Sequence, residues 1–290
     1  MKKTINELRK IKSFGKIAML TAYDFPSAQL ADENGIDVVL VGDSVGTNVL
    51  GYKDVSEVTM EDMLHHVKAV ARGAKNAFIL ADFPYKSFQT PEQGVENAKR
   101  LMNANADGVK IEGGTEIAGI VGKIVQNNIP VCAHIGYTPQ TKGEKPTVQG
   151  RDALSAKELI TSAIDLEKAG AFMIVLELLT LELAGEITKI LRIPTIGIGS
   201  GPLCDGQVLV VHDMTGMTAR KFKHVKNYGN ARKELAGSIA LYSHDVKNNL
   251  FPAIENSSSM ESGVHAQVGK WITESNIDNK NTHPGMARRD

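Results

Sequence analysis

The 290-residue sequence contains little cysteine, few aromatic residues and no excess of either charge. Its two cysteines, Cys132 and Cys204, each lie in or beside an apolar run, which favours buried free thiols and a reducing, cytoplasmic location. The 33 basic and 33 acidic residues give a formal net charge of zero. Because phosphate backbones attract strongly basic surfaces, this balance argues against nucleic acid as the main partner.

Long hydrophobic runs are absent as well. The basic N-terminal stretch leads into Ile17–Leu20, which is followed at once by Thr21 and Asp24, so the run is too short for a secretory signal. No stretch approaches the roughly 20 apolar residues that span a bilayer. We therefore expect a soluble protein with no membrane partner, whose 42% hydrophobic content allows a sizeable core.

Eight short, apolar, β-branched runs recur along the chain. They are Ile17–Leu20, Val38–Val41, Phe78–Ala81, Val109–Ile111, Val131–Ala133, Phe172–Leu176, Thr195–Ile198 and Val208–Val211. Amphipathic segments lie between most of them, which predicts parallel strands joined by helical crossovers. Eight strands close a barrel, so the sequence predicts a single-domain (β/α)8 TIM barrel of the α/β class. The pattern alone leaves an open, doubly wound sheet as the alternative.

Helix signals and changes in composition give the expected boundaries. Thr90 before Pro91, Thr59 before Asp62, and Ser155 before Glu158 are N-cap patterns. Helices are expected to stop at Gly35, Gly73 and Gly170. We expect a lead-in over residues 1–15, the catalytic barrel over 16–254, and a polar C-terminal tail without periodicity over 255–290.

Functional side chains follow five of the predicted strands. They are Asp43, Asp82, Glu112, His134 and Glu177. The carboxyl ends of the strands form the active-site face of a barrel, so these side chains are expected to meet at one mouth. One acid at a strand end could equally cap a helix or begin a turn. Four acids in the same relative position favour a site.

Gathered carboxylates repel one another and need positive charge. Oxygen ligands select hard cations such as Mg²⁺, which usually takes one or two protein carboxylates and keeps several waters. We expect Asp43 and Asp82 as direct ligands of Mg²⁺, and Glu112 as a ligand directly or through water.

Lys110 lies on the same face of its strand as Glu112, because side chains alternate along a strand. It could hold a substrate carboxylate or stabilise developing negative charge. It could also form a Schiff base, or simply pair with a neighbouring acid. The surrounding carboxylates should keep it protonated, which disfavours the Schiff base.

Other polar features are less specific. The glycines of Gly197–Gly201 could form a phosphate site or a tight turn. His65 and His66 lie on a predicted helix as surface or packing residues, whereas His212 and Asp213 could line the mouth or be structural.

The sequence resembles the ketopantoate hydroxymethyltransferase family over about residues 19–251. The resemblance rests on nine ordered motifs: MLTAYD (19–24), VLVGDSVG (39–46), LADFPY (80–85), VKIEGG (109–114), VCAHIGYTPQ (131–140), VQGR (148–151), VLELL (175–179), IPTIGIGSG (193–201) and CDGQVLVVHDMTG (204–216).

The resemblance implies a reaction in pantothenate and coenzyme A biosynthesis. 3-Methyl-2-oxobutanoate would gain a hydroxymethyl group from 5,10-methylenetetrahydrofolate, a co-substrate, through a Mg²⁺-stabilised enolate, giving 2-dehydropantoate. The family's metal acids match Asp43, Asp82 and Glu112, and its proton acceptor matches Glu177. Its substrate contacts match Ser44, Asp82, Lys110 and His134. Family members also form homo-oligomers, often decamers.

Two other enzymatic interpretations remain open from the residues. One is a Schiff-base aldolase that uses Lys110, and the other is a different metal-dependent 2-oxo acid lyase. An inactive barrel that serves in assembly is disfavoured, because every matched position carries a competent side chain.

Overall fold

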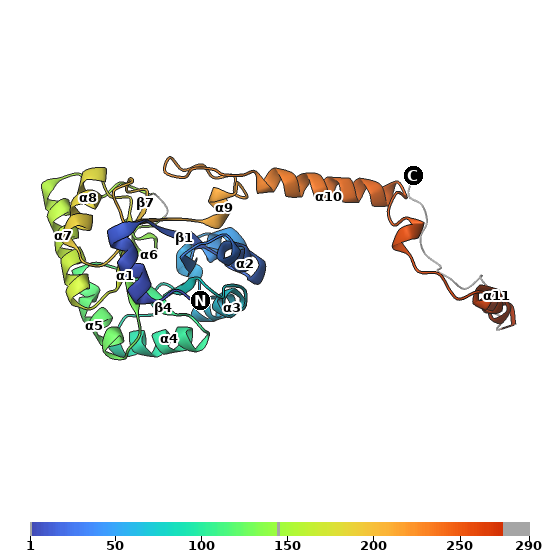
Figure 1. Ribbon diagram of the computed structural model, residues 1–290, viewed down its shortest axis with the longest axis horizontal. Coiled ribbons are helices and arrows are strands. Elements are labelled where there is room, and N and C mark those ends of the chain that lie inside the picture. The colour runs from blue at the N-terminus through green and yellow to red at the C-terminus, as the bar shows by residue number, and fades with distance from the viewer. Residues whose placement is uncertain (1, 144–145, 275–290) are drawn as a thin grey trace. The chain divides into compact units, whose positions relative to one another are not determined.

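The computed structural model describes residues 2–143 and 146–274 and divides into two compact units, Met1–Arg232 and Lys233–Asp290 (Figure 1). The first unit contains all eight strands. Residues 275–290 of the expected tail lie outside the described residues. The expected domain boundary at residue 254 stays a prediction.

Eight parallel strands close into a barrel in sequence order, which confirms the predicted (β/α)8 fold. The strands are β1 (Ile17–Thr21), β2 (Val38–Val41), β3 (Phe78–Asp82), β4 (Gly108–Glu112), β5 (Val131–Gly136), β6 (Met173–Glu177), β7 (Thr195–Ile198) and β8 (Gly206–Leu209). The last strand begins two residues earlier than expected. Gly206 allows the close approach to β1, because a Cβ there would lie 2.5 Å from the carbonyl oxygen of Ile17.

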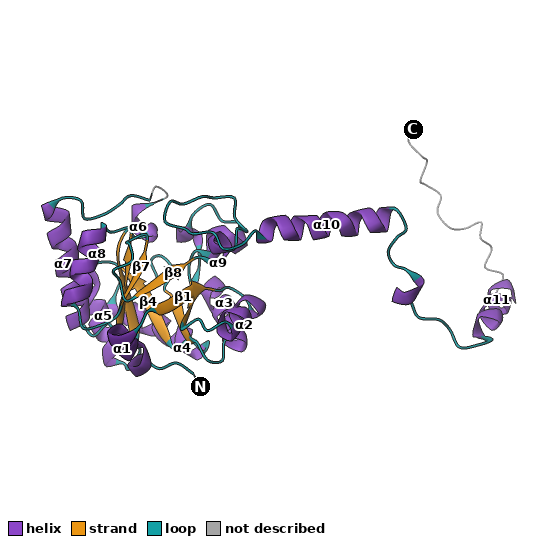
Figure 2. Cartoon of the chain, turned by 45° about the horizontal axis from the view of Figure 1, so that its top comes forward, coloured by secondary structure: helices purple, strands orange, loops and turns teal. Residues whose placement is uncertain are grey.

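Helices surround the strands, as Figure 2 shows. In the first unit they are α1 (Ile5–Phe14), α2 (Phe25–Glu33), α3 (Met60–Gly73), α4 (Pro91–Asn103), α5 (Ala118–Gln126), α6 (Pro139–Lys142), α7 (Ala153–Lys168), α8 (Leu181–Ile190) and α9 (Val211–Met214). The expected N-caps Thr59 and Thr90 are confirmed. Ser155 as a cap was wrong, because the Asp152 carboxylate accepts from the backbone N–H groups of Leu154 and Ser155 and caps α7.

The inward-facing side chains change from apolar to polar along β3, β5 and β6. Leu80, Cys132 and Val175 are buried in the barrel interior. Two residues further along the same strands stand Asp82, His134 and Glu177, on the same side because side chains alternate with a period of two. The barrel is therefore an apolar core at its amino end and carries polar groups at its carboxyl end.

Helix α1 packs on the apolar end of the barrel and makes up most of the expected lead-in over residues 1–15. Its Leu8 is fully buried in the cluster of inward-facing strand residues. Lys3 and Lys12 form ion pairs with Asp37 and Asp205, which precede β2 and β8. The lead-in therefore belongs to the end of the barrel opposite the polar groups.

The second unit contains most of α10 (Ala231–Lys247) and all of α11 (Val264–Glu274). The second helix falls in the stretch for which the sequence shows no periodicity. Within the described residues, no helix combines the length and apolar character needed to cross a membrane. Cys132 and Cys204 are free and buried, as expected.

Candidate active site

Strand register places the charged groups of the carboxyl end next to one another. Asp82 of β3 pairs with Lys110 of β4, and Glu112 of β4 pairs with His134 of β5. Lys110 Nζ lies 2.7 Å from Asp82 Oδ1 and 3.9 Å from Glu112 Oε1. These four side chains are at most 6% exposed. The structure therefore brings the expected residues of β3, β4 and β5 together in one buried group.

Asp43 and Glu177 extend this group at its two ends. The backbone N–H of Asp43 donates to Asp82 Oδ2 at 3.1 Å, so the first two acids are adjacent. His134 Nδ1 lies 3.2 Å from Glu112 Oε1, and its Nε2 lies 3.3 Å from Glu177 Oε2. Neither ring nitrogen has hydrogen-bond geometry to a partner among the described residues, so these contacts are ionic.

Burial and like charges oppose ionisation of the first two acids. Burial raises the pKa of Asp43 to about 8, and the charges of Asp82 and Glu112 act in the same direction. Burial also raises the pKa of Asp82, although Lys110 opposes the shift. Burial lowers the pKa of Lys110, but the charges of Asp82, Glu112 and Asp43 outweigh it and raise this pKa overall. Lys110 is thus a stable cation, as expected.

His134 carries the second positive charge. Burial lowers its pKa, but Glu112 and Glu177 outweigh burial and raise the pKa to about 9. Burial favours a higher pKa for Glu112, but the charge of His134 outweighs burial and lowers this pKa overall. At neutral pH the site therefore holds an imidazolium next to the Glu112 carboxylate.

The donor set at Asp43 and Asp82 fits a hard cation. Asp43 is a buried carboxyl whose raised pKa reflects too little nearby positive charge, and binding a divalent cation would supply that charge. Over residues 2–143 and 146–274, no three His, Cys, Asp or Glu side chains are arranged to hold a metal by themselves. Mg²⁺ commonly takes one or two carboxylates and completes its shell with water or substrate oxygens. Glu112 as a third ligand stays a prediction.

Ser44, the expected substrate contact, lies at the rim beside a residue that sequence reasoning missed. Its Oγ is 2.9 Å from the hydroxyl of the buried Tyr23. Gln140 was missed too, although it ends the VCAHIGYTPQ motif. Its amide nitrogen donates to Asp43 Oδ2 at 2.8 Å and to the carbonyl oxygen of Phe83 at 2.7 Å. The proline that follows β5 indicates a turn at this position, but it does not indicate where the glutamine side chain points.

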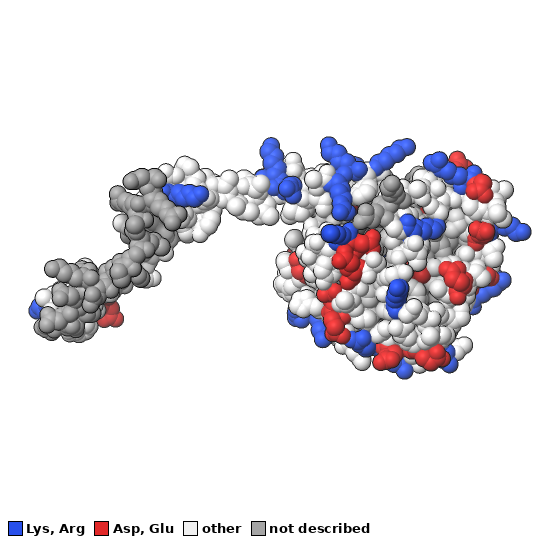
Figure 3. Space-filling model, turned by 180° about the vertical axis from the view of Figure 1, so that it is seen from behind, with Lys and Arg blue, Asp and Glu red and all other residues white. Residues whose placement is uncertain are grey.

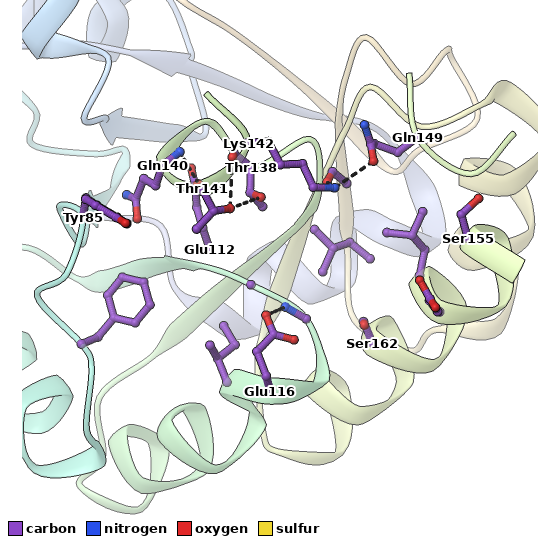
Figure 4. A pocket seen from close by; sticks show the side chains of 18 of the residues that line it. Tyr85, Glu112, Glu116, Thr138, Gln140, Thr141, Lys142, Gln149, Ser155 and Ser162 are labelled. Carbon is purple, nitrogen blue, oxygen red and sulfur yellow. Dashed lines mark hydrogen bonds between the residues drawn. The ribbon is translucent and has the colours of Figure 1, made fainter. Parts of the chain in front are cut away.

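Two cavities open beside the group of charged residues. One, of about 520 Å³, is lined by Glu112 and Gln140, which lie close together at one end, with Ser155 and Ser162 at the other (Figure 4). The second, of about 370 Å³, is lined by Glu177 with Arg220 and His224. Residues of the segment 137–143 line both cavities, so this segment separates them.

His65 and His66 follow their interpretation as surface and packing residues. His66 is buried and its Nδ1 contacts the carbonyl oxygen of Tyr23 at 2.6 Å, whereas His65 is exposed. His212 lies in α9 rather than at a strand end, and its ring is 5.5 Å from that of Tyr23. Gly199 and Gly201 both have positive φ, as a tight turn requires.

Similar solved structures share the fold at low sequence identity. A phosphonopyruvate hydrolase, solved with oxalate and Mg²⁺, aligns with a TM-score of 0.59 and 13% identity, covering 96% of this chain and 99% of that chain. A 2,3-dimethylmalate lyase of the PEP mutase/isocitrate lyase superfamily aligns with a TM-score of 0.55 and 14% identity, covering 95% and 100%. These likenesses support the barrel assignment alone.

Sequence relatives are much closer. The 3-methyl-2-oxobutanoate hydroxymethyltransferase of Thermotoga sp. (strain RQ2) is 50% identical over 87% of this chain and 95% of its own length. The enzyme of the same name from Chloroflexus aurantiacus is 45% identical over 90% and 94%. The profile of the family described as ketopantoate hydroxymethyltransferase matches residues 2–254. The acids, lysine and histidine at the mouth of the barrel all lie within these matched residues. The chain belongs to the ketopantoate hydroxymethyltransferase family.

Proposed function

We propose that the protein transfers a hydroxymethyl group from 5,10-methylenetetrahydrofolate to 3-methyl-2-oxobutanoate, giving 2-dehydropantoate for pantothenate and coenzyme A synthesis. This proposal rests on one continuous group of charged side chains at the mouth of the barrel: Asp43, Asp82, Lys110, Glu112, His134 and Glu177. Within it, the carboxyl groups of Asp43 and Asp82 lie beside the ammonium of Lys110 and could bind a further cation. Such a site suits a small 2-oxo acid together with a divalent cation. The names of the family and of the relatives support 3-methyl-2-oxobutanoate as the acceptor and a hydroxymethyl group as the unit transferred, and the folate donor is our proposal.

Asp43 and Asp82 would hold Mg²⁺, with Glu112 close by. When bound, the ion would draw electron density from the keto group and so stabilise an enolate. Lys110 and Ser44 would hold and orient the substrate's oxygens, and the lysine adds fixed positive charge where negative charge develops. These groups would lower the free energy of the enolate relative to the keto acid.

Glu177 would be the general base that removes the proton from C3. Its side chain is 18% exposed and lines the second cavity, so it is the most accessible acid of the group. The ring of His134 lies 3.3 Å from this carboxyl group and would help to hold it toward the substrate. Water would hydrolyse the methylene bridge, breaking its two carbon–nitrogen bonds and releasing tetrahydrofolate and a formaldehyde unit. The C3 carbanion would then add to the carbonyl carbon of that unit, and its oxygen would take up a proton to become the hydroxyl group.

The contacts of Lys110 oppose a Schiff-base aldolase. An amine must lose its proton to attack a ketone, whereas Lys110 is held as a cation by three acids and donates to Asp82. A different metal-dependent 2-oxo acid lyase would use the same residues but would need no folate.

Proton exchange at C3 separates these functions. In D₂O with 3-methyl-2-oxobutanoate and Mg²⁺, NMR should show loss of the C3 proton, which chelation abolishes and added Mg²⁺ restores. 2-Dehydropantoate should form only when 5,10-methylenetetrahydrofolate is present. Borohydride trapping of substrate on Lys110, or turnover without the folate, would overturn the proposal.

We expect Glu177→Gln to abolish C3 exchange while Mg²⁺ and the oxo acid still bind. The amide keeps the shape of the carboxylate but cannot accept the proton. Exchange is followed by NMR and binding by calorimetry, with the exposed Glu186→Gln of α8 as the matched control. Exchange at the wild-type rate would remove Glu177 from the role of base.

The proposal includes a setting for the enzyme. We expect a cytoplasmic homo-oligomer, such as a decamer, that acts on small molecules. We expect neither nucleic acid nor a membrane as its partner. On the face drawn in Figure 3, acidic and basic side chains lie next to one another over much of the first unit, which is consistent with that expectation.

A further inference from the structure

Gln140 is a buried glutamine set directly over the acids of the mouth. It lies in α6, the short helix that follows β5, and only 6% of it is exposed. Pro139 starts this helix and Gly143, with a φ of +75°, ends it. Two hydrogen bonds stabilise the turn. One joins the hydroxyls of Thr138 and Thr141, and in the other the Lys142 ammonium donates to the carbonyl oxygen of Gly136. The glutamine is therefore delivered to the site by a defined turn.

One residue thus connects three strand ends. Gln140 Nε2 donates to Asp43 Oδ2 at 2.8 Å and to the carbonyl oxygen of Phe83 at 2.7 Å, so both amide protons are engaged. Its backbone N–H donates to Glu112 Oε2 at 3.2 Å. The first of these bonds holds the Asp43 carboxylate by one of its two oxygens, Oδ2. A neutral donor can hold an acid in this way without competing for its charge.

The carbonyl oxygen of the same amide remains without a hydrogen-bond partner among the described residues. Buried polar atoms are nearly always paired with protein or water, so an unpaired acceptor here indicates a missing donor. A donor can reach this oxygen from the cavity beside the site, because Gln140 lines that cavity and its amide nitrogen contacts Asp43. A hydrated Mg²⁺ brings water molecules whose O–H groups are strong donors.

We propose that Gln140 is the positioning residue of the cation site. It orients the Asp43 carboxylate toward the divalent ion, and its unpaired carbonyl oxygen accepts a hydrogen bond from water that enters with the ion. This inference rests on the proposed function in one respect, since it requires that a divalent ion binds at Asp43. Residues that orient a ligand typically change metal affinity 10- to 100-fold when they are lost.

The test uses Gln140→Met, which keeps the length of the side chain but removes the amide. Mn²⁺ binding to the full chain is titrated by electron paramagnetic resonance, and unfolding is followed by thermal melting. We expect the Kd for Mn²⁺ to rise roughly 10- to 100-fold. The melting temperature should fall by several degrees, because the Asp43 carboxyl group and the Phe83 carbonyl lose a buried donor. Excess Mg²⁺ should restore kcat, because the defect is one of metal affinity. Gln29→Met, at an exposed glutamine of α2, is the control and should bind Mn²⁺ normally.

Gln140→Asn is the second variant, because its shorter amide reaches one acceptor but not both. Its Kd for Mn²⁺ should lie between those of the wild type and Gln140→Met. If Gln140→Met does not fold, Gln140→Asn by itself tests the proposal. Wild-type Kd values in the folded variants would overturn the role of Gln140 and leave the proposed function intact. A wild-type protein that binds no Mn²⁺ and exchanges no C3 proton would instead overturn the proposed function, and this inference with it.

Discussion

At the scale of single residues, His134 is where charge and stability meet. Its pKa of about 9 in the folded protein exceeds the ordinary value of about 6.5, because Glu112 and Glu177 flank the ring. Protonation therefore favours the folded state. This contribution is fully present below about pH 6.5 and is lost as the pH rises through about 9.

We expect this linkage to appear in melting experiments on His134→Gln without metal. The variant should melt below the wild type at about pH 6, and the difference should shrink as the pH rises toward about 9. His65→Gln, at an exposed histidine of α3, serves as the control and should show a small difference at every pH. A His134→Gln difference that grows with pH would contradict the ionic contacts described above.

The residues of β3 to β6 that face the mouth could be predicted from the sequence, and Gln140 could not. Asp82, Lys110 and Glu112 lie on strands, where a period of two fixes the side that each occupies. Gln140 lies in a turn, where no such period applies. Its placement depends on acceptors supplied by Asp43 and Phe83, which are far away in the sequence.

At the scale of elements, the end of β5 is held by a glycine that no other residue can easily replace. Gly136 has a φ of +103°, and a Cβ there would overlap the carbonyl oxygen of Glu177 and the side chain of Leu179. The next residue, Tyr137, donates its backbone N–H to that same carbonyl at 2.9 Å. The proposed base and the turn that carries Gln140 are thus joined through one close backbone approach.

Gly136→Ala should disturb both the proposed base, Glu177, and the turn that carries Gln140. The added methyl group forces β5 and β6 apart, at a cost of about 1–3 kcal/mol, so we expect a melting temperature several degrees lower together with slower C3 exchange. Gly119→Ala is the matched control, because a Cβ at this exposed position of α5 meets nothing within 4 Å. It should be neutral or slightly stabilising. A wild-type melting temperature for Gly136→Ala would show that the backbone accommodates the methyl group.

Element types were predicted well, and element ends less well. The run Val208–Val211 is apolar, yet the strand is Gly206–Leu209, because close packing on β1 selects Gly206 and α9 begins at Val211. Likewise, both Asp152 and Ser155 suit an N-cap, and the choice between them depends on where the preceding chain enters. Local pattern does not contain that information.

At the scale of the whole molecule, α10 presents an apolar face to solvent. Leu235, Ile239, Tyr242 and Val246 recur at helical spacing and are 50%, 59%, 61% and 43% exposed. Contiguous exposed apolar side chains of this kind commonly mark a surface for association. They agree with the homo-oligomer that we expect.

Sedimentation of the wild type and of Leu235→Glu with Ile239→Lys tests this expectation. The wild type should sediment as a homo-oligomer, and the double variant as a smaller species, because charged side chains replace apolar ones while the Glu–Lys spacing supports the helix. Ser238→Lys on the same helix is the control and should leave the mass unchanged. A monomeric wild type would contradict the prediction. An unchanged mass with a lower melting temperature would place the apolar face within one chain.

The pairing of β8 with β1 has a consequence for how the protein is made. Ile17 and Gly206 come from opposite ends of the first unit, so the ring of backbone hydrogen bonds is completed only after the ribosome has released nearly all of it. Until then the nascent chain carries an incomplete sheet with two bare edges, and such edges readily capture other strands. The yield of folded protein should therefore depend on translation rate and chaperone supply as well as on the equilibrium stability of the finished barrel.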